Sequence, residues 1–212
     1  MEINVSSQPL RMGWVLGWAI PQTWFEAKVL QVFPQESHTF IKSSEDVLDE
    51  INKHAPYDHL IGYSLGALLL LTEKEKIINL AKCFTLLAPI LAFTNEMELG
   101  GITPRVNLQI AKRALKQNQE KACIDFYKLT NLDVPDILID SLEKNDLTWG
   151  LEQLETRAYT SQVPSNWKSY VGGNDPLLNV DLLLKSIPHL KVIHQAGHEP
   201  DNLLLVMKEA LI

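Results

Sequence analysis

Residues 57–71 read Tyr-Asp-His-Leu-Ile-Gly-Tyr-Ser-Leu-Gly-Ala-Leu-Leu-Leu-Leu. The stretch places the pattern G-x-S-x-G, centred on Ser64, between an apolar run typical of a buried strand and a run typical of a helix. A serine in such a turn is held in a strained backbone conformation that lifts its hydroxyl above the end of the sheet. Gly62 and Gly66 permit this conformation, because side chains there would collide with the neighbouring strand and helix. We therefore interpret Ser64 as a nucleophile, the alternative being a glycine-containing strand end without a chemical role.

The helix predicted after this turn begins at Ser64, so its unpaired amides and positive end face any negative charge that develops nearby. The amide of Leu65, the residue after the nucleophile, is therefore one expected donor to an oxyanion. A second donor is expected from the loop after an early strand, here residues 16–19, with the amide of Trp18 as the candidate. The alternative for Trp18 is a core aromatic residue, and the two roles are compatible.

A serine hydroxyl is a poor nucleophile near neutral pH unless a base takes its proton and a carboxylate orients that base. In a sheet of this type the acid and then the histidine follow the serine, each on a loop after a later strand. The acid candidate is Asp175, in the glycine-rich loop Gly172-Gly-Asn-Asp-Pro176 that follows an apolar run. The alternative for Asp175 is a turn aspartate that accepts hydrogen bonds from its own backbone. The neighbouring Asn174 cannot carry the negative charge that stabilises an imidazolium.

The base candidate is His198, which lies past the last predicted strand, where Gly197 allows a sharp bend. His194 competes, but it belongs to the predicted strand and is interpreted as a packed or edge residue. The remaining histidines are interpreted as structural, and their spacing matches no metal site; they are His38, His54, His59 and His189. We expect no metal and no cofactor.

Outside these motifs the chain alternates between strand-like and helix-like segments. Strands are predicted at residues 14–17, 38–41, 57–64, 83–89, 167–171 and 190–194. Helices are predicted at residues 22–33, after residues 43–44, at 64–76, near 177–185 and from about 200. Such alternation implies right-handed crossovers, so we expect an α/β fold with a mostly parallel sheet of about six strands flanked by helices.

The alternation breaks at about residues 93–163, where four helix-like segments follow one another without a convincing strand between them. These segments begin near Pro104, Gln119, Pro135 and Asp146. We interpret the region as a helical insertion in a single domain of residues 1–212, since a chain of this length suits one large domain.

Charge and cysteine content limit the partners and the compartment. The chain has 19 Lys and Arg against 26 Asp and Glu, a net charge of -7, which argues against general binding to nucleic acid or to an anionic membrane. Only two cysteines are present, Cys83 in a predicted buried strand and Cys123 in a predicted helix, which favours a reduced, cytoplasmic protein. Residues 1–11 lack the features of a signal peptide, and the apolar run at 14–20 is shorter than the roughly 20 residues that span a membrane. We expect no membrane anchor, and a monomer is the simplest expectation.

Together these motifs resemble the α/β-hydrolase family, and within it the pimeloyl-[acyl-carrier protein] methyl ester esterases of biotin synthesis, the BioH-like kind. Four segments carry the resemblance over most of the chain: Gly17-Trp18 followed by Trp24, Gly62-Tyr-Ser-Leu-Gly66, Gly172-Gly-Asn-Asp-Pro-Leu177 and Gln195-Ala-Gly-His-Glu-Pro200. The resemblance implies that Ser64, Asp175 and His198 form a catalytic triad and that the amides of Trp18 and Leu65 form the oxyanion hole.

Two departures from the family pattern are visible. Position 16 is Leu where the family has a histidine before the Gly-Trp pair, a change that bears on how the oxyanion loop is braced. The chain also begins almost at the strand of residues 14–17, so the first two strands usual in the fold are expected to be absent or reduced to residues 2–5. Neither departure removes a member of the triad.

In the related enzymes a helical cap covers the pocket and selects the acyl group, so the resemblance implies this role for the insertion. Between residues 102 and 121 it carries five cations against the single acid Glu120, namely Arg105, Lys112, Arg113, Lys116 and Lys121. An acidic acyl-carrier protein is attracted to such a face, chiefly through a faster association rate. A solvated helix face is the alternative. Apolar residues such as Ile110, Leu115, Phe126 and Tyr127 are expected either to line an acyl channel or to belong to the core.

The resemblance thus implies a serine carboxylesterase that hydrolyses the methyl ester of a carrier-bound dicarboxylic acyl chain through an acyl-enzyme. A general short-chain esterase and an acyl thioesterase use the same machinery and stay open. A catalytically silent fold that serves as a binding module is a third hypothesis, against which the complete set of Ser64, Asp175 and His198 weighs.

Overall fold

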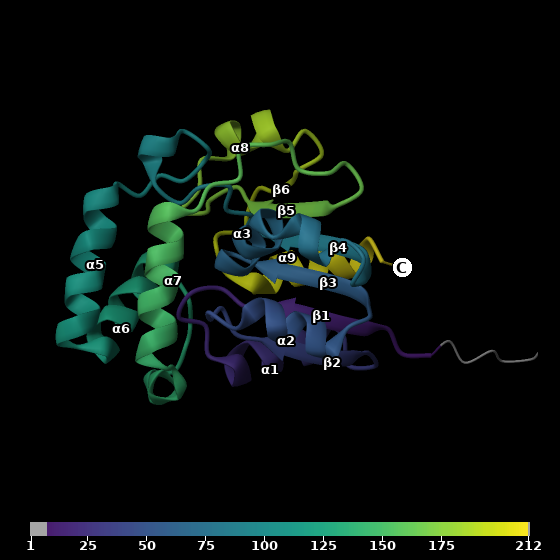
Figure 1. The fold of residues 1–212 in the computed structure, drawn as a ribbon, viewed down its shortest axis with the longest axis horizontal. Helices are drawn as coiled ribbons and strands as arrows, with labels where there is room; N and C mark the ends of the chain where they lie inside the picture. The colour runs from purple at the N-terminus through teal and green to yellow at the C-terminus, as the bar shows by residue number, and fades with distance from the viewer. Residues whose placement is uncertain (1–7, 212) are drawn as a thin grey trace, which may run out of the picture.

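A six-stranded sheet forms the centre of the molecule (Figure 1). In the computed structural model, which describes residues 8–211, the strand order is β2-β1-β3-β4-β5-β6 and all neighbours are parallel. The strands are β1 Arg11–Val15, β2 Ser37–Ile41, β3 Tyr57–Tyr63, β4 Ala81–Leu87, β5 Lys168–Gly172 and β6 Lys191–Ile193. The predicted parallel sheet of about six strands is therefore confirmed.

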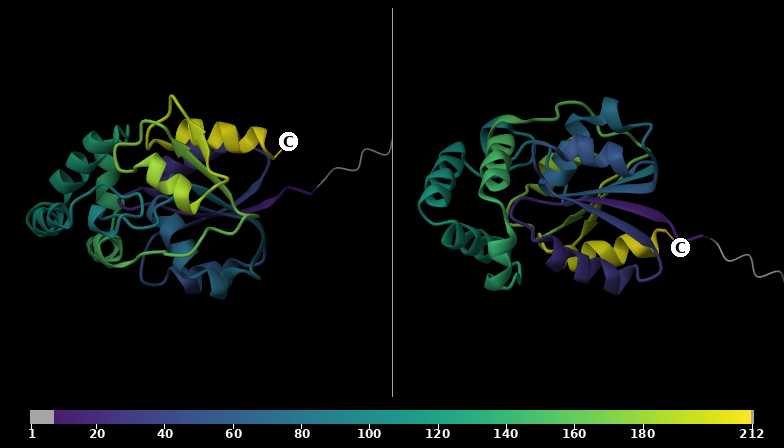
Figure 2. Two further views of the ribbon diagram at one scale, coloured as in Figure 1. Left: turned by 90° about the horizontal axis from the view of Figure 1, so that it is seen from above. Right: turned by 60° about the horizontal axis from the view of Figure 1, so that its bottom comes forward.

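Helices cover both faces of this sheet (Figure 2). The helices α1 (Gln22–Val32) and α9 (Pro200–Glu209) lie on one face, and α2 (Val47–His54) and α3 (Leu65–Thr72) lie on the other. A parallel sheet that is covered on both faces needs nearly continuous apolar strands. β3 meets this requirement, since six of its seven residues are buried.

A helical segment separates β4 from β5 and lies at the carboxyl ends of the strands (Figure 1). It contains η1 Asn95–Met97, α5 Arg105–Gln117, α6 Gln119–Thr130, η2 Asp136–Ser141 and α7 Lys144–Thr156. The chain enters and leaves it at one place, because Ala92 and Ala158 form an antiparallel bridge and the Tyr159 amide donates to the Leu91 carbonyl at 2.7 Å. We call this segment the cap; its predicted limits, residues 93–163, stay a prediction.

Three predicted helices have different limits. The helix expected at 64–76 divides at Glu73 into α3 and α4 (Lys74–Ile77), where the Thr72 hydroxyl donates to the Leu68 carbonyl and Arg157 of the cap pairs with Glu73 at 2.7 Å. The helix near 177–185 begins only at α8 (Val180–Ser186), because Asp175 accepts the Leu177 amide in a turn. The segment after Pro135 forms the short 3-10 helix η2 rather than an α-helix.

Two expectations about the strands also change. β1 ends at Val15 and Gly17 belongs to the following loop, so the strand lies earlier than predicted. The prediction that Cys83 is buried is wrong, because only the second half of β4 enters the core and Cys83 is exposed near the start of the strand. The reduced strand expected at residues 2–5 lies outside the described residues.

None of the helices within residues 8–211 is long and apolar enough to cross a membrane.

His59 is a polar residue inside the sheet. Its side chain is 3% exposed, and its Nε2 lies 2.7 Å from the Thr85 hydroxyl on β4. Burial, together with the positive charge of Lys168, lowers the pKa of His59 to about 4. The folded protein therefore holds the neutral ring, whereas an unfolded chain protonates it below about pH 6.5.

This difference predicts a loss of stability in mild acid. Because the folded-state pKa of His59 lies below the unfolded-state value, its contribution is complete above about pH 6.5 and is lost as the pH falls toward 4, by up to about 3 kcal/mol. We expect the unfolding free energy of His59→Gln, measured by urea denaturation, to depend less on pH in this range than that of the wild type. Equal slopes in the two proteins would contradict the assignment.

Candidate active site

Ser64 occupies the sharp turn between β3 and α3. Its backbone has φ 55° and ψ -116°, a left-handed conformation that costs a residue with a side chain free energy, as predicted for the nucleophile position. The space for this turn depends on two glycines. A Cβ atom at Gly62 would lie 2.7 Å from Cα of Ala67, and one at Gly66 would lie 2.1 Å from the Val15 carbonyl oxygen. The helix therefore packs with its backbone directly against β1, and Ser64 is held at the carboxyl edge of the sheet.

The loops after β5 and β6 approach each other backbone to backbone. A Cβ atom at Gly172 would lie 2.0 Å from the Gly197 carbonyl oxygen, so only glycine fits between the loops. Two amides of the first loop also donate to the second, Gly173 to the Ile193 carbonyl and Asn174 to the Ala196 carbonyl, both at 2.9 Å. These contacts bring the acid candidate and the base candidate to one place.

Ser64, His198 and Asp175 form a hydrogen-bonded chain. His198 Nε2 lies 3.0 Å from the Ser64 hydroxyl, and His198 Nδ1 lies 2.7 Å from Asp175 Oδ2. Because a carboxylate only accepts, Nδ1 carries the proton and donates to Asp175, which leaves Nε2 to accept from the serine. All three are almost entirely buried, with 5%, 1% and 6% of their surfaces exposed.

The alternatives weighed for these positions are also answered. Asp175 does accept a hydrogen bond from its own loop, from the Leu177 amide at 2.9 Å, while its other oxygen contacts His198, so the turn contact is compatible with the predicted role of the acid. Asn174 points away and donates to the His194 carbonyl. His194 is exposed in the turn after β6, not in the strand as predicted, and takes no part in the chain.

Tyr63, at the end of β3, contacts the loop that carries His198. Its hydroxyl donates to the His198 carbonyl at 2.7 Å, and the ring lies 5.5 Å from the imidazole. Burial, and next the negative charge of Asp175, raise the pKa of Tyr63 well above its usual value, so the hydroxyl stays protonated and keeps donating. The residue between the first glycine and the serine of the motif thus holds the base in place.

The loop of residues 16–20 lies against Ser64. A Cβ atom at Gly17 would lie 3.1 Å from Cβ of Ser64, and Ala19 has the positive φ of 56°. The Trp18 amide belongs to this loop, and the Leu65 amide is the first of α3, where amides have no partner within the helix. The Trp18 side chain is 6% exposed and packs under the cap, so it is also a core aromatic residue.

Known structures share this arrangement of strands and helices. The esterase EaEST from Exiguobacterium antarcticum matches with a TM-score of 0.75 at 13% identity, over 96% of this chain and 91% of that one. MGS-M2, an alpha/beta hydrolase enzyme from a Medee basin deep-sea metagenome library, matches with a TM-score of 0.65 at 13% identity, over 100% and 89%. BioG from Haemophilus influenzae matches with a TM-score of 0.57 at 12% identity, over 92% and 91%. No protein-family model and no curated protein sequence matches the chain.

The chain has the α/β-hydrolase fold. The resemblance drawn from the sequence motifs is thus confirmed for the fold. Identities of this size establish the fold and not the reaction, because one fold hosts many activities. The chemistry must be argued from the site, which in open α/β sheets lies at the carboxyl ends of the strands, as Ser64 does here.

An apolar cavity of about 410 Å³ lies within the cap of this α/β-hydrolase fold. Its inner end is lined by Trp18, which lies in the loop beside Ser64, and by Leu177, which lies two residues after Asp175. Its outer end is lined by Ile110 and Leu129, which are 56% and 58% exposed. The cavity therefore leads from the neighbourhood of the site to the surface between α5 and α6. Ser64 itself is not among the residues that line this cavity.

The expected channel residues divide between two roles. Ile110 and Phe126 line the apolar cavity. Leu115 is 1% exposed and belongs to the core. Tyr127 is also buried, and its hydroxyl donates to the Ala19 carbonyl at 2.6 Å instead of lining the cavity.

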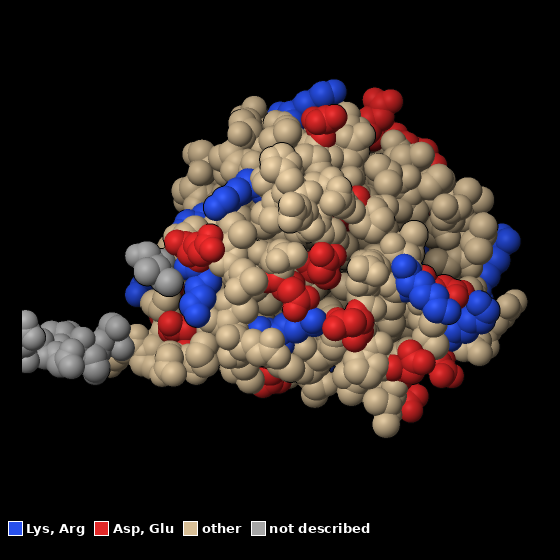
Figure 3. Space-filling view, turned by 180° about the vertical axis from the view of Figure 1, so that it is seen from behind, with Lys and Arg blue, Asp and Glu red and all other residues tan. Residues whose placement is uncertain are grey.

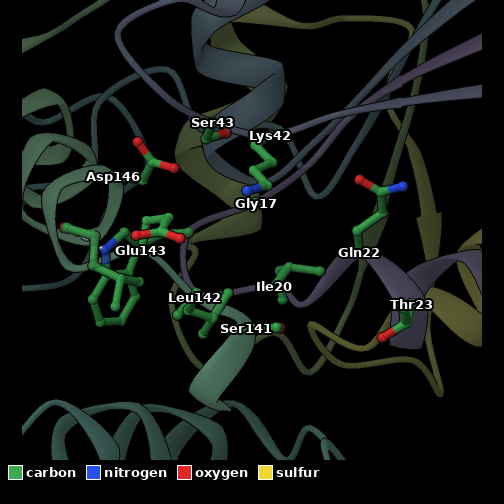
Figure 4. Close-up of a pocket in the computed structure, with 13 residues that line it drawn as sticks. Gly17, Ile20, Gln22, Thr23, Lys42, Ser43, Ser141, Leu142, Glu143 and Asp146 are labelled. Atoms are coloured by element: carbon green, nitrogen blue, oxygen red, sulfur yellow. Dashed lines mark hydrogen bonds between the residues drawn. The ribbon is translucent and has the colours of Figure 1, made fainter. Parts of the chain in front are cut away.

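A second cavity of about 290 Å³, with several charged and polar residues in its lining, lies on another side of the loop of residues 16–20 (Figure 4). Gly17, Trp18, Ala19 and Ile20 contribute to its wall, together with polar residues of α1, β2 and the cap. Its carboxylates Glu143 and Asp146 lie on one side of the view, with Lys42 beside them. Burial, and in part the charge of Glu143, raise the pKa of Asp146, while Lys42 opposes the shift.

The predicted basic face of the cap is partly neutralised. Lys112 pairs with Glu155 of α7 at 2.5 Å, and Lys121 pairs with Asp125 at 2.8 Å. The three other cations of the predicted set, Arg105, Arg113 and Lys116, are exposed and form no ion pair within residues 8–211. On the face seen in Figure 3, basic and acidic side chains are likewise interspersed. Lys112 is therefore a structural residue of the α5–α7 contact rather than a free docking cation.

Sequence reasoning missed two residues that shape the site. Tyr63 gave no signal, because the position before the serine in the motif accepts many residues. Gly150 did give one, since a glycine in the middle of a predicted helix is costly and needs a packing reason. Here the reason is Trp18, whose Cδ1 would lie 2.6 Å from a Cβ atom at that position. Within residues 8–211 no group of three or more His, Cys, Asp or Glu side chains is placed to hold a metal ion.

The backbone contact at Gly66 predicts a large effect of one methyl group. In Gly66→Ala the new Cβ meets a backbone carbonyl that cannot move without shifting β1, so we expect the unfolding free energy to fall by about 3 kcal/mol or more. Gly197→Ala is the control, because its Cβ would meet only the flexible end of the Glu199 side chain. Denaturant unfolding of both variants tests this; equal stabilities would show that the contact at Gly66 is not limiting.

Proposed function

We propose that the protein is a serine carboxylesterase that works through an acyl-enzyme. The observation that supports this most is the buried chain from Ser64 through His198 to Asp175, with contacts of 3.0 and 2.7 Å beside the N-terminus of α3. A serine, a base and an orienting carboxylate in this order are what acyl transfer requires. The shared fold with the esterase EaEST accords with the proposal.

In the proposed reaction His198 Nε2 takes the proton of Ser64 as the serine oxygen attacks the ester carbonyl. Asp175 stabilises the imidazolium that forms, and the amides of Leu65 and Trp18 donate to the oxyanion. The imidazolium then protonates the leaving alcohol. In the second half His198 deprotonates a water molecule, which attacks the acyl-enzyme, releases the acid and restores Ser64.

The proposed substrate is the methyl ester of a dicarboxylic acyl chain carried by acyl-carrier protein, as in biotin synthesis. The apolar cavity is large enough for an extended acyl chain, and its outer end opens beside α5, which also carries the exposed cations Arg105, Arg113 and Lys116. A carrier bound there would present the chain with its ester toward the site. We propose a cytoplasmic location for this reaction, which the free cysteines Cys83 and Cys123 support.

Two other functions require parts of the same site. A general short-chain esterase or an acyl thioesterase needs the same triad, and relative rates on methyl esters, nitrophenyl esters and acyl thioesters distinguish them. A catalytically silent binding module needs only the cavity. If a fluorophosphonate probe does not label Ser64 in the folded protein, that result would favour the silent module.

The chemistry predicts a steep dependence on the triad. We expect Ser64→Ala to abolish both fluorophosphonate labelling and hydrolysis of 4-nitrophenyl butyrate. Asp175→Asn should lower kcat by about 10³- to 10⁴-fold, because His198 is then held in the wrong tautomer without a compensating charge. Asn174→Ala is the matched control in the same loop and should remain within about twofold of the wild type, since its side chain faces the His194 carbonyl. Similar losses in the two loop variants would remove the assignment of Asp175.

The pathway is tested in cells. The wild-type gene should restore growth of a biotin auxotroph that lacks its esterase, and Ser64→Ala should not. Growth supported equally by the variant would eliminate this substrate while leaving the esterase chemistry to the assays above.

Carrier docking predicts an effect that depends on the form of the substrate. We expect the double variant Arg113→Glu and Lys116→Glu to lower kcat/KM for a carrier-bound ester by about tenfold at low salt, mainly through slower association, and to leave 4-nitrophenyl butyrate unaffected. The control is Lys191→Glu. Lys191 is an exposed cation at the start of β6, so it lies at the amino end of that strand, whereas the cap lies at the carboxyl ends. Equal losses on both substrates, or none on the carrier-bound ester, would contradict docking at α5.

A further inference from the structure

The loop that carries the Trp18 amide is held mainly by the cap. Its carbonyl at Ala19 accepts from the buried hydroxyl of Tyr127 on α6 at 2.6 Å. Its Trp18 indole donates to the Leu147 carbonyl of α7 at 2.8 Å. The same indole packs edge-to-face with the ring of Phe126, with the ring centres 4.8 Å apart. Three contacts from two cap helices thus converge on two adjacent residues of the loop.

The contact with α7 requires a glycine. Gly150 lies in the middle of α7, a position where glycine lowers helix stability. A Cβ atom there would lie 2.6 Å from the Trp18 ring and 3.2 Å from Leu65 Cδ2. The helix backbone therefore rests on both residues whose amides are proposed to bind the oxyanion.

The loop has little other support on its outer side. Ala19 has a left-handed backbone conformation, which persists only where the surroundings hold it. The second cavity, of about 290 Å³, borders Gly17, Trp18, Ala19 and Ile20, so packed side chains are missing there (Figure 4). The hydroxyl of Ser43, a half-buried residue in the loop after β2, donates to the Leu16 carbonyl, three residues before the strained turn.

We propose that Tyr127 and Gly150 are positioning residues that set the Trp18 amide for the oxyanion, so that the cap takes part in catalysis and not only in substrate selection. The inference rests on the proposed esterase function. It also accounts for Leu16, because the cap supplies the bracing that a histidine at this position would otherwise provide. A donor held within a few tenths of an ångström of the oxyanion matters mainly in the transition state, so its displacement lowers kcat more than it raises KM.

The first test compares two tyrosines. Tyr127→Phe removes the hydroxyl that holds Ala19, and we expect kcat on 4-nitrophenyl butyrate to fall about tenfold with KM within about twofold of the wild type. Tyr159→Phe is the matched control, since that buried tyrosine donates to the Gln162 carbonyl at 3.1 Å, away from the loop. Affinity for a trifluoromethyl ketone, which forms an oxyanion on Ser64, should fall by the same factor as kcat in Tyr127→Phe and stay unchanged in the control. Parallel behaviour of the two variants would overturn the inference.

A second variant separates positioning from stability. Gly150→Ala raises the helix propensity of α7 but pushes its methyl group against Trp18. We expect kcat and trifluoromethyl ketone affinity to fall about tenfold while the folded protein persists in denaturant unfolding. Wild-type activity in Gly150→Ala would overturn the role of the α7 contact. Absence of hydrolysis and of fluorophosphonate labelling in the wild type would instead refute the proposed function itself, so the two failures are distinguishable.

Discussion

The close approach of α3 to β1 is the constraint on which the rest of the site depends. Gly66 lets the first turn of the helix rest on the Val15 carbonyl, and Gly62 removes the side chain that would meet the Ala67 backbone. With the helix this close, Ser64 must turn with a positive φ, and its hydroxyl then projects beyond the end of β3. The same geometry places the unpaired Leu65 amide beside the hydroxyl. The candidate nucleophile and one candidate oxyanion donor are therefore both positioned by one packing contact.

The other half of the site uses the same device between two loops. Gly172 and Gly197 meet backbone to backbone, and this contact fixes the distance between Asp175 and His198 more firmly than side-chain packing would. Tyr63 then connects the two halves, because it precedes Ser64 on β3 and donates to the carbonyl of His198. Buried polar groups of this kind are costly unless every one has a partner. Here each member of the chain has one, which makes the buried arrangement sustainable.

The sequence carried enough to predict the sheet and the meeting of Ser64, Asp175 and His198. Local patterns sufficed, because each residue follows an apolar strand and parallel strands end at the same edge. The position of helix boundaries was harder, since side-chain bonds such as Thr72 to Leu68 and Asp175 to Leu177 compete with the helix and depend on tertiary neighbours.

The contacts of the cap were harder still to predict from the sequence. The run of cations was visible, but the pairing of Lys112 with Glu155 joins residues 43 positions apart and depends on how α5 packs against α7. The exposure of Cys83 likewise depends on strand pairing, because β4 pairs with β5 only from Thr85 onward. Contacts of this range cannot be obtained from periodicity.

Under the proposed function, the cap links substrate choice to chemistry through one side chain. Trp18 lines the apolar cavity and donates from its indole nitrogen to α7, while its backbone amide belongs to the loop beside Ser64. A chain that fills the cavity presses on the same residue that is proposed to bind the oxyanion. In the proposed reaction, binding energy from a remote acyl chain would thus be available at the reacting carbonyl, which is how an enzyme converts recognition into rate rather than into affinity alone. Exclusion of water alone does not require the backbone of α7 at Gly150 to contact the Trp18 ring directly, as it does here.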